Sequence, residues 1–86
     1  FKIESLVDEV IVNGRDTQLK YKVTNITDES KKVTLTIGLY DKKTDKLINY
    51  SSTDKQFAPK EEVEIETIFL IPLNGEYYIK KIISNI

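Results

Sequence analysis

The sequence contains no cysteine, histidine, tryptophan or methionine. Without cysteine the chain forms no disulfide and offers no thiolate nucleophile, and without histidine it lacks the commonest general base. No G-x-S-x-G elbow marks a nucleophilic serine. The longest apolar run, IFLIP at 68–72, is too short to span a bilayer. These absences predict a non-enzymatic chain that needs no cofactor and does not insert directly into a membrane.

Charge is abundant in the sequence but evenly balanced. Thirteen Lys and Arg residues face fourteen Asp and Glu residues, giving a formal net charge of -1, and the two signs are interspersed. A nucleic-acid-binding chain usually carries a basic patch, which is missing here, so we expect no nucleic-acid partner. The 86 residues, 40% of them hydrophobic, predict a single globular domain over 1–86. The chain begins at Phe1 rather than methionine, and we expect it to be excised from a longer polypeptide.

The segment 32–41, KVTLTIGLYD, has the clearest pattern in the chain. Apolar residues stand at every second position, and threonine, glycine or tyrosine stands between them. This period-two pattern is typical of a strand with one buried face, and β-branched threonine suits the other, half-exposed face. The segment therefore predicts the central strand of a sheet.

Other segments repeat this alternation with less regularity. The stretches 17–25, 62–71 and 76–83 predict strands, and Pro72 ends the second of them. For Phe1–Val12, helical and strand spacing compete. We predict one interrupted strand, followed by a hairpin turn at Asn13–Gly14.

The stretch 47–52 predicts a short strand of uncertain register. Either Leu47 and Asn49 or Ile48 and Tyr50 would face inward. The polar residues that follow, and a bend around Phe57 with its ring tucked under the sheets, would lead into the next strand.

About seven short strands, with turn signals spaced by roughly 8–12 residues, predict an all-β fold. We expect an antiparallel immunoglobulin-like β-sandwich of about seven strands, with a small closed barrel as the alternative. The predicted core consists of the inward apolar residues of the clearest strands: Leu19, Tyr21, Val23, Val33, Leu35, Ile37, Leu39, Val63, Ile65, Phe69 and Ile79.

Three stretches resemble the immunoglobulin-like or fibronectin type III-like modules of bacterial surface and secreted proteins. They are LYDKKTDKLI at 39–48, FAPKEEVEIE at 57–66 and IPLNGEYYIK at 71–80. Lys60 stands where such modules usually have glycine, and Lys81 where an apolar residue is usual. The resemblance implies a spacer, adhesin or accessory domain and no particular ligand. Tyrosine near the last turn, Tyr77 or Tyr78, would pack in the core and bind a loop backbone through its hydroxyl.

Carboxylate chemistry has little support in the sequence. Glu62, Glu64 and Glu66 recur at every second residue, which places them side by side on one strand face. Such a row favours solubility and protection of a sheet edge over acid–base catalysis, which also needs an enclosed site.

Oxygen ligands for calcium are present in two loops. Asp41, Asp45 and Asn49 surround one loop, and Asp28 with Glu29 lie in another. The spacing differs from that of an EF-hand, and Asp and Asn are ordinary turn residues, so we predict no metal site.

Two tyrosines are the candidate ligand-binding residues. Tyr40 faces away from the core in the predicted register, and Tyr50 falls on the neighbouring strand. Either they stabilise the sheet as a cross-strand aromatic pair or they bind a ligand. The sequons at 25–27 and 49–51 are expected to be chance matches.

The sequence thus favours a non-catalytic structural or spacer module of a larger bacterial extracellular or cell-envelope protein. Its partners would be the neighbouring domains of the same polypeptide. The alternative is a binding module for a cell-surface glycan or protein, which would use Tyr40 and Tyr50. A third hypothesis is a regulatory sandwich that presents a protruding loop to an enzyme.

Overall fold

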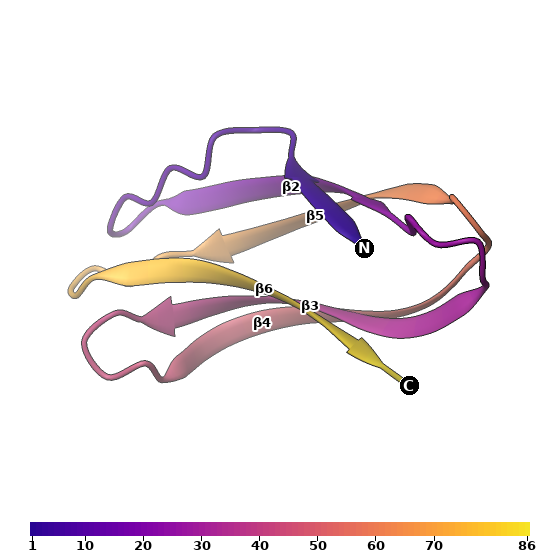
Figure 1. Cartoon of the computed structure of the whole chain (residues 1–86). Coiled ribbons are helices and arrows are strands. Elements are labelled where there is room, and N and C mark those ends of the chain that lie inside the picture. Colours follow the sequence, from indigo (N-terminus) through magenta and orange to yellow (C-terminus); the bar gives the residue numbers. More distant parts are fainter.

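The computed structural model describes residues 1–86 and consists of two stacked β-sheets without a helix (Figure 1). One sheet has the order β1-β2-β5 and the other β4-β3-β6, and every pairing is antiparallel. The prediction of a two-layered all-β fold is confirmed, with six strands in place of about seven. The strands are β1 (Lys2–Ser5), β2 (Asp16–Thr24), β3 (Lys31–Asp41), β4 (Leu47–Phe57), β5 (Glu62–Leu70) and β6 (Tyr77–Asn85).

The core lies between the two sheets and follows the period-two pattern of the sequence. The buried apolar residues are Leu19, Tyr21, Val23, Val33, Leu35, Ile37, Leu39, Phe57, Phe69 and Ile71. Eight of them were predicted, and the three other predicted residues, Val63, Ile65 and Ile79, pack against this cluster while partly buried. Phe57 closes the bend after β4 with its ring fully buried, as expected, and contacts Phe1 edge-on at 5.1 Å between ring centroids.

The prediction for the N-terminal stretch is only partly correct. Residues 2–5 form β1 beside the end of β2, but residues 6–15 leave the sheet. Three hydrogen bonds hold them beside β2: from the Leu6 amide to the Lys20 carbonyl at 2.8 Å, from the Thr17 hydroxyl to the Val10 carbonyl at 2.9 Å and from the Tyr21 hydroxyl to the Glu9 carboxylate at 2.6 Å. The physical reason is a tertiary contact that the local pattern does not show, because Glu9 in this segment binds the Tyr21 hydroxyl and the Lys81 ammonium through its side chain.

The Asn13–Gly14 turn is present, with Gly14 at a φ of 77°, but it joins this irregular segment to β2 instead of joining two paired strands. The Asn13 side-chain amide donates to the carbonyls of Pro72 and Gly75, both at 2.9 Å. The turn therefore ties two loops together at one end of the sandwich. We call this end, with loops 11–15, 42–46 and 71–76, the loop end.

The prediction for the fourth strand is wrong in length and in facing. β4 continues through the polar residues 51–56, which bond to β3 along its whole length. Leu47, Ile48 and Tyr50 are all exposed, and so is Asn49. A register shift between Leu39 and Tyr40 places a bulge in β4, which breaks the alternation that the prediction assumed.

Both chain ends lie in the half of the molecule away from the loop end (Figure 1). Lys2 pairs with Thr24 and Asn85 pairs with Val33, on either side of the loop 25–30. Buried Asn25 organises this terminal end, because its side-chain amide donates to the carbonyls of Glu29 at 2.8 Å and Ala58 at 3.1 Å. With its side chain enclosed, the sequon at 25–27 offers no accessible acceptor.

Candidate binding surface

The outer face of the β4-β3-β6 sheet is poor in charge and rich in hydroxyl groups. We call it the hydroxyl face. Its only charged side chains are Lys32, Asp54 and Lys80, as the strand registers show. Its hydroxyl-bearing residues are Thr34, Thr36, Tyr40, Tyr50, Ser52, Tyr78 and Ser84.

Cross-strand contacts hold part of this face rigid. The Thr34 hydroxyl donates to the Asp54 carboxylate at 2.7 Å, and the Thr36 and Ser52 hydroxyls lie 3.3 Å apart. Hydrogen-bonded pairs of this kind stabilise neighbouring strands and fix the side chains in one rotamer. The face therefore presents ordered hydroxyl groups on a rigid sheet.

Tyr40 has a structural role at the loop end of this face. Its ring lies over Gly38, so close that a Cβ atom added there would come within 2.7 Å of the ring. The ring also stacks on Tyr78 with 5.4 Å between centroids and 16° between planes. The Tyr78 hydroxyl donates to Asp45 at 3.0 Å, and this hydrogen bond raises the pKa of Tyr78.

Tyr50 is more exposed to solvent than Tyr40. It lies opposite Gly38 in the β3–β4 register, and 59% of the residue is exposed. Gly38 itself is buried, because the Tyr40 ring and Leu47 fill the space that its side chain would take, but Tyr50 stays exposed. Tyr40 and Tyr50 thus lie on one face and on neighbouring strands, as predicted, but only Tyr50 is highly exposed.

Tyr78 was missed as a member of this face because the prediction assigned the corner to either Tyr77 or Tyr78. Tyr77 is the corner residue, since it packs against the core and its hydroxyl donates to the Asn74 carbonyl at 2.6 Å. Strand alternation from Tyr77 then places Tyr78 on the outer face. That alternation was the available signal.

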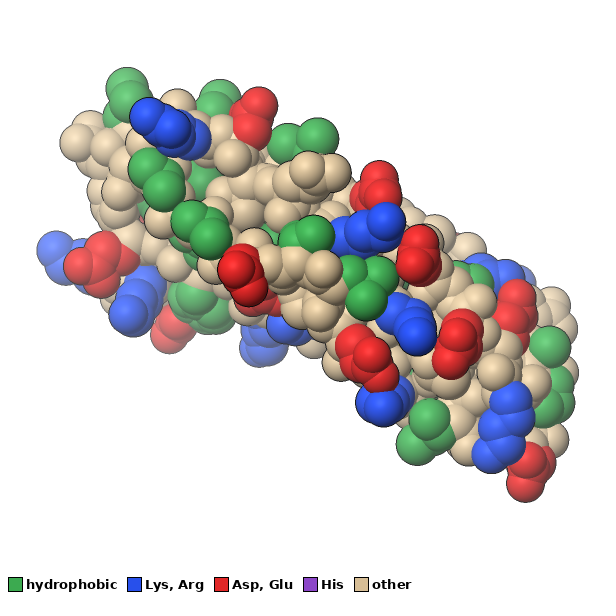
Figure 2. Space-filling view, turned by 90° about the horizontal axis from the view of Figure 1, so that it is seen from above, with side chains coloured by type: hydrophobic (Ala, Val, Ile, Leu, Met, Phe, Trp, Pro, Cys, Tyr) green, Lys and Arg blue, Asp and Glu red, His purple; other side chains and the backbone are tan.

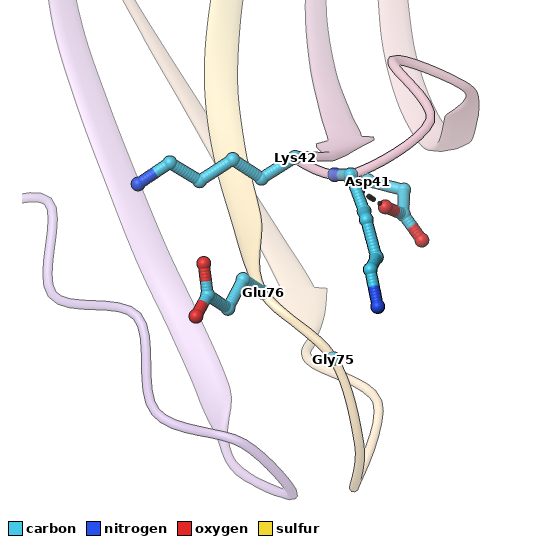
Figure 3. Close-up of a pocket in the computed structure, with 5 residues that line it drawn as sticks. Asp41, Lys42, Gly75 and Glu76 are labelled. Atoms are coloured by element: carbon cyan, nitrogen blue, oxygen red, sulfur yellow. Dashed lines mark hydrogen bonds between the residues drawn. The ribbon is translucent and has the colours of Figure 1, made fainter.

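An open polar cleft of about 500 Å³ lies at the loop end, lined by Asp41, Lys42, Lys43, Gly75 and Glu76 (Figure 3). The Lys42 and Glu76 side chains extend toward the same side in Figure 3, and the Lys42 amide donates to the Glu76 carbonyl at 2.9 Å. The cleft has no hydrophobic lining residue and is open to solvent. It is a gap between two loops that a backbone hydrogen bond joins.

The predicted oxygen ligands serve the turns of the chain. Asp41 accepts from the amides of Lys43 at 2.8 Å and Thr44 at 3.1 Å, while Asp45 accepts from Tyr78 and Asn49 accepts from the following amide. Asp28, in the other loop, lies 3.5 Å from the Lys60 ammonium. The structure groups no three His, Cys, Asp or Glu side chains where they would hold a metal ion.

The outer face of the β1-β2-β5 sheet has the opposite character, and we call it the charged face. Glu62, Glu64 and Glu66 lie side by side along β5, as predicted. Lys20 lies 3.3 Å from Glu66 and 3.7 Å from Glu64, and Lys22 lies 3.9 Å from Glu62. Acidic and basic side chains alternate over one half of this side in Figure 2, while apolar side chains gather toward the loop end.

The apolar part of the charged face comes from the second half of β5. Ile68 and Leu70 point outward with 61% and 64% of each residue exposed, beside Leu73 at 80%. The sequence indicates this region through the stretch 68–71, which is apolar on both strand faces. Nothing in the structure covers these side chains.

One charged cluster lies between the two sheets. The Glu9 carboxylate accepts from the Tyr21 hydroxyl at 2.6 Å and from the Lys81 ammonium at 3.0 Å. Partial burial opposes the charge on Glu9, but these two hydrogen bonds outweigh it and the pKa of Glu9 lies below its ordinary value. Burial, and then the bond to Glu9, raise the pKa of Tyr21. Lys81 thus occupies an inward position because Glu9 neutralises its charge.

No protein-family model, curated protein or solved structure matches this chain. The structure also contains no helix that is long and apolar enough to cross a membrane. Function must therefore be argued from the surfaces described above.

Proposed function

We propose that this chain is a non-catalytic, immunoglobulin-like module of a larger bacterial extracellular or cell-envelope protein, and that its hydroxyl face binds a cell-surface glycan. The observation that carries the proposal is the setting of Tyr50. Its exposed ring lies beside Gly38 on the face with the fewest charges. Resemblance to bacterial surface modules supports the location of the parent protein.

The chemistry of this face suits an uncharged, hydroxylated ligand. Charged side chains must lose hydration when a neutral ligand covers them, and this face has only Lys32, Asp54 and Lys80. Tyrosine, serine and glycine are the residues that dominate many adaptable binding surfaces, because tyrosine supplies contact area at low entropy cost. Ordered hydroxyls at Thr36 and Ser52 would exchange hydrogen bonds with the ligand.

The position of the tyrosines also supports a binding role. Tyr40 and Tyr78 belong to the loop end, whereas both chain ends lie at the terminal end. Any adjoining polypeptide therefore joins the module at the terminal end. The tyrosine-bearing part of the hydroxyl face would project away from these points of attachment.

The proposal is tested by calorimetric titration with soluble xylan, soluble β-glucan and peptidoglycan fragments. Tyr50→Ala should weaken binding on the order of tenfold, as expected for an exposed aromatic contact residue. Ile68→Ala is the matched control, because Ile68 is equally exposed on the opposite face. Equal losses in the two variants, or no binding by any of these glycans, would refute the glycan proposal.

A spacer function is the second candidate, supported by the hydrogen-bonded terminal end. Asn25 there joins the loop 25–30 to Ala58, which would fix the angle at which neighbouring domains leave. Since both chain ends lie on one side, a spacer would hold its neighbours beside one another. Small-angle scattering of the module with its neighbouring domains should then give a compact envelope, whereas a linear rod would contradict this candidate.

A further inference from the structure

We propose that the free edge of β6 accepts an extended peptide strand in which acidic and apolar residues alternate. This inference concerns the edge of a sheet and does not depend on the hydroxyl face. The partner would add a fourth strand to the β4-β3-β6 sheet. Its main-chain groups would give affinity, and its side chains would give selectivity.

β6 is the edge strand best suited to strand addition. It spans nine residues and pairs only with β3, with no irregularity in that register, so its other edge is unpaired from Tyr77 to Asn85. The other edges are less suited to strand addition. β1 has four residues, β4 contains a bulge, and β5 carries the glutamate row, and such features discourage edge-to-edge pairing.

The charge on β6 indicates which strand would fit. β6 carries Lys80 and Lys81 and no acidic residue. Lys81 is already paired with Glu9, whereas Lys80 is exposed, contacts no carboxylate and lies 5.7 Å from the centroid of the Tyr40 ring. An acidic residue opposite Lys80 would complete a cross-strand ion pair, and a basic residue there would be repelled.

The inner side of the same edge is apolar on either side of Lys81, whose charge Glu9 neutralises, and it is incompletely covered. Ile79 and Ile83 point toward the core but are only partly buried, because β1 ends after four residues and leaves their side chains exposed at the rim. A narrow crevice of about 10 Å³ opens among Ile3, Val23 and Ile83. Its volume holds at most one water molecule. Inward residues of an added strand would therefore cover these side chains at the mouth of the crevice, and apolar residues fit that position.

The required alternation occurs within the chain itself, which supplies a probe. Residues 62–70 read EVEIETIFL, and a synthetic peptide of this sequence carries three glutamates followed by Ile and Leu on one face and Val, Ile, Thr and Phe on the other. The charge-reversed peptide KVKIKTIFL has the same apolar face. Amide NMR titrations of the intact chain with each peptide measure both the site and the affinity.

We expect EVEIETIFL to slow amide hydrogen exchange at alternate residues of β6 and to shift the β6 resonances. Lys80→Glu should weaken that binding about three- to fivefold, the effect of one exposed cross-strand pair, and should strengthen binding of KVKIKTIFL by a similar factor. Tyr50→Ala should leave both affinities unchanged, which separates this site from the proposed glycan site. Far-ultraviolet circular dichroism verifies that each variant is folded.

Four results would overturn the proposal. Peptide-induced protection at β4 or β5 would place the site elsewhere, and equal binding of both peptides to both proteins would remove the electrostatic argument. Protection of β6 that grows with protein concentration in the absence of peptide would identify a second copy of the chain as the occupant. Absence of any protection in β6 would show that the edge accepts no strand of this chemistry.

Discussion

The two outer faces of this sandwich rest on the same core and each spans three strands, yet they carry different chemistry. On the charged face, lysines of β2 lie against glutamates of β5, with Lys20 within 3.7 Å of both Glu64 and Glu66. On the hydroxyl face, threonine, serine and tyrosine take the equivalent outward positions. A charged surface stays hydrated and discourages contact, whereas a partner that covers a surface with few charges loses less desolvation free energy.

We propose that the two faces have separate tasks, because the alternation of a half-buried strand does not by itself require either composition. Both patterns satisfy the alternation that a half-buried strand requires. The part of the charged face that carries Lys20, Lys22 and the glutamate row has the composition of a surface that remains in water. The hydroxyl face, with Tyr50 beside Gly38, has the composition of a contact surface. Four predictions examine this comparison, in decreasing order of effect on stability.

The largest effect should come from the core that both faces share. Leu39 is fully buried under the hydroxyl face, and Leu39→Ala should lower the free energy of unfolding by about 2–5 kcal/mol. Urea unfolding followed by circular dichroism measures this loss. Leu73→Ala, at a residue that is 80% exposed, serves as the control and should change stability by less than about 0.5 kcal/mol. A small loss for Leu39→Ala would mean that the two sheets do not share one core.

Gly38→Ala should disturb the hydroxyl face in particular. The added Cβ would lie 2.7 Å from the Tyr40 ring and 3.1 Å from Leu47, so the ring must move away from Tyr78. We expect a loss of about 1–2 kcal/mol from this overpacking, instead of the gain that alanine usually brings to a strand. Ring-to-ring nuclear Overhauser effects between Tyr40 and Tyr78 should disappear. In the Tyr40→Ala background the same substitution should be neutral or stabilising, and an equal loss there would contradict the account.

The cluster of Glu9, Tyr21 and Lys81 predicts how the free energy of unfolding depends on pH. The pKa of Glu9 is lower in the folded chain than in the unfolded chain, so its contribution is present above the unfolded value of about 4.3 and is lost as pH falls through the folded value. Glu9→Gln should cost roughly 1 kcal/mol at pH 7, because its bonds to Tyr21 and Lys81 lose their charge. The difference in the free energy of unfolding between the parent chain and Glu9→Gln should disappear in acid. A difference that persists unchanged at pH 2 would show that the carboxylate charge is irrelevant.

The smallest effect should come from the ion pairs of the charged face. Glu64→Gln removes one partner of Lys20 and should lower the urea midpoint slightly at low salt. In 1 M NaCl the variant and the parent chain should have equal midpoints, because salt screens exposed charges. Lys80→Met on the hydroxyl face should show no comparable salt dependence, since Lys80 has no carboxylate partner. If the urea midpoints of the two variants depended equally on salt, the proposed electrostatic difference between the two faces would be contradicted.

Much of this architecture follows from alternation in the sequence. The pattern at 17–25, 32–41 and 62–71 correctly places the inward residues, among them Leu19, Leu35 and Phe69. The same alternation places Tyr40 outward. These features depend on local geometry, because a strand puts successive side chains on opposite faces.

The errors occur where tertiary contacts override local pattern. β4 was expected to be short because residues 51–56 are polar, but an edge strand tolerates polar side chains on both faces when β3 supplies its hydrogen bonds. The bulge near Leu39 moves Leu47 out of register with Asn49, and no local signal marks it. The inward position of Lys81 depends on Glu9, which is distant in the sequence and lies in a segment without regular structure.

The most direct test of the account is a map of amide chemical shifts across both faces during titration with soluble xylan, soluble β-glucan and peptidoglycan fragments. The account predicts that one of these ligands shifts the amides of Gly38, Tyr40 and Tyr50 and leaves those of Lys20 and Glu64 unchanged. Shifts confined to the charged face, or a spectrum that none of the ligands alters, would contradict the assignment of the hydroxyl face as the binding surface.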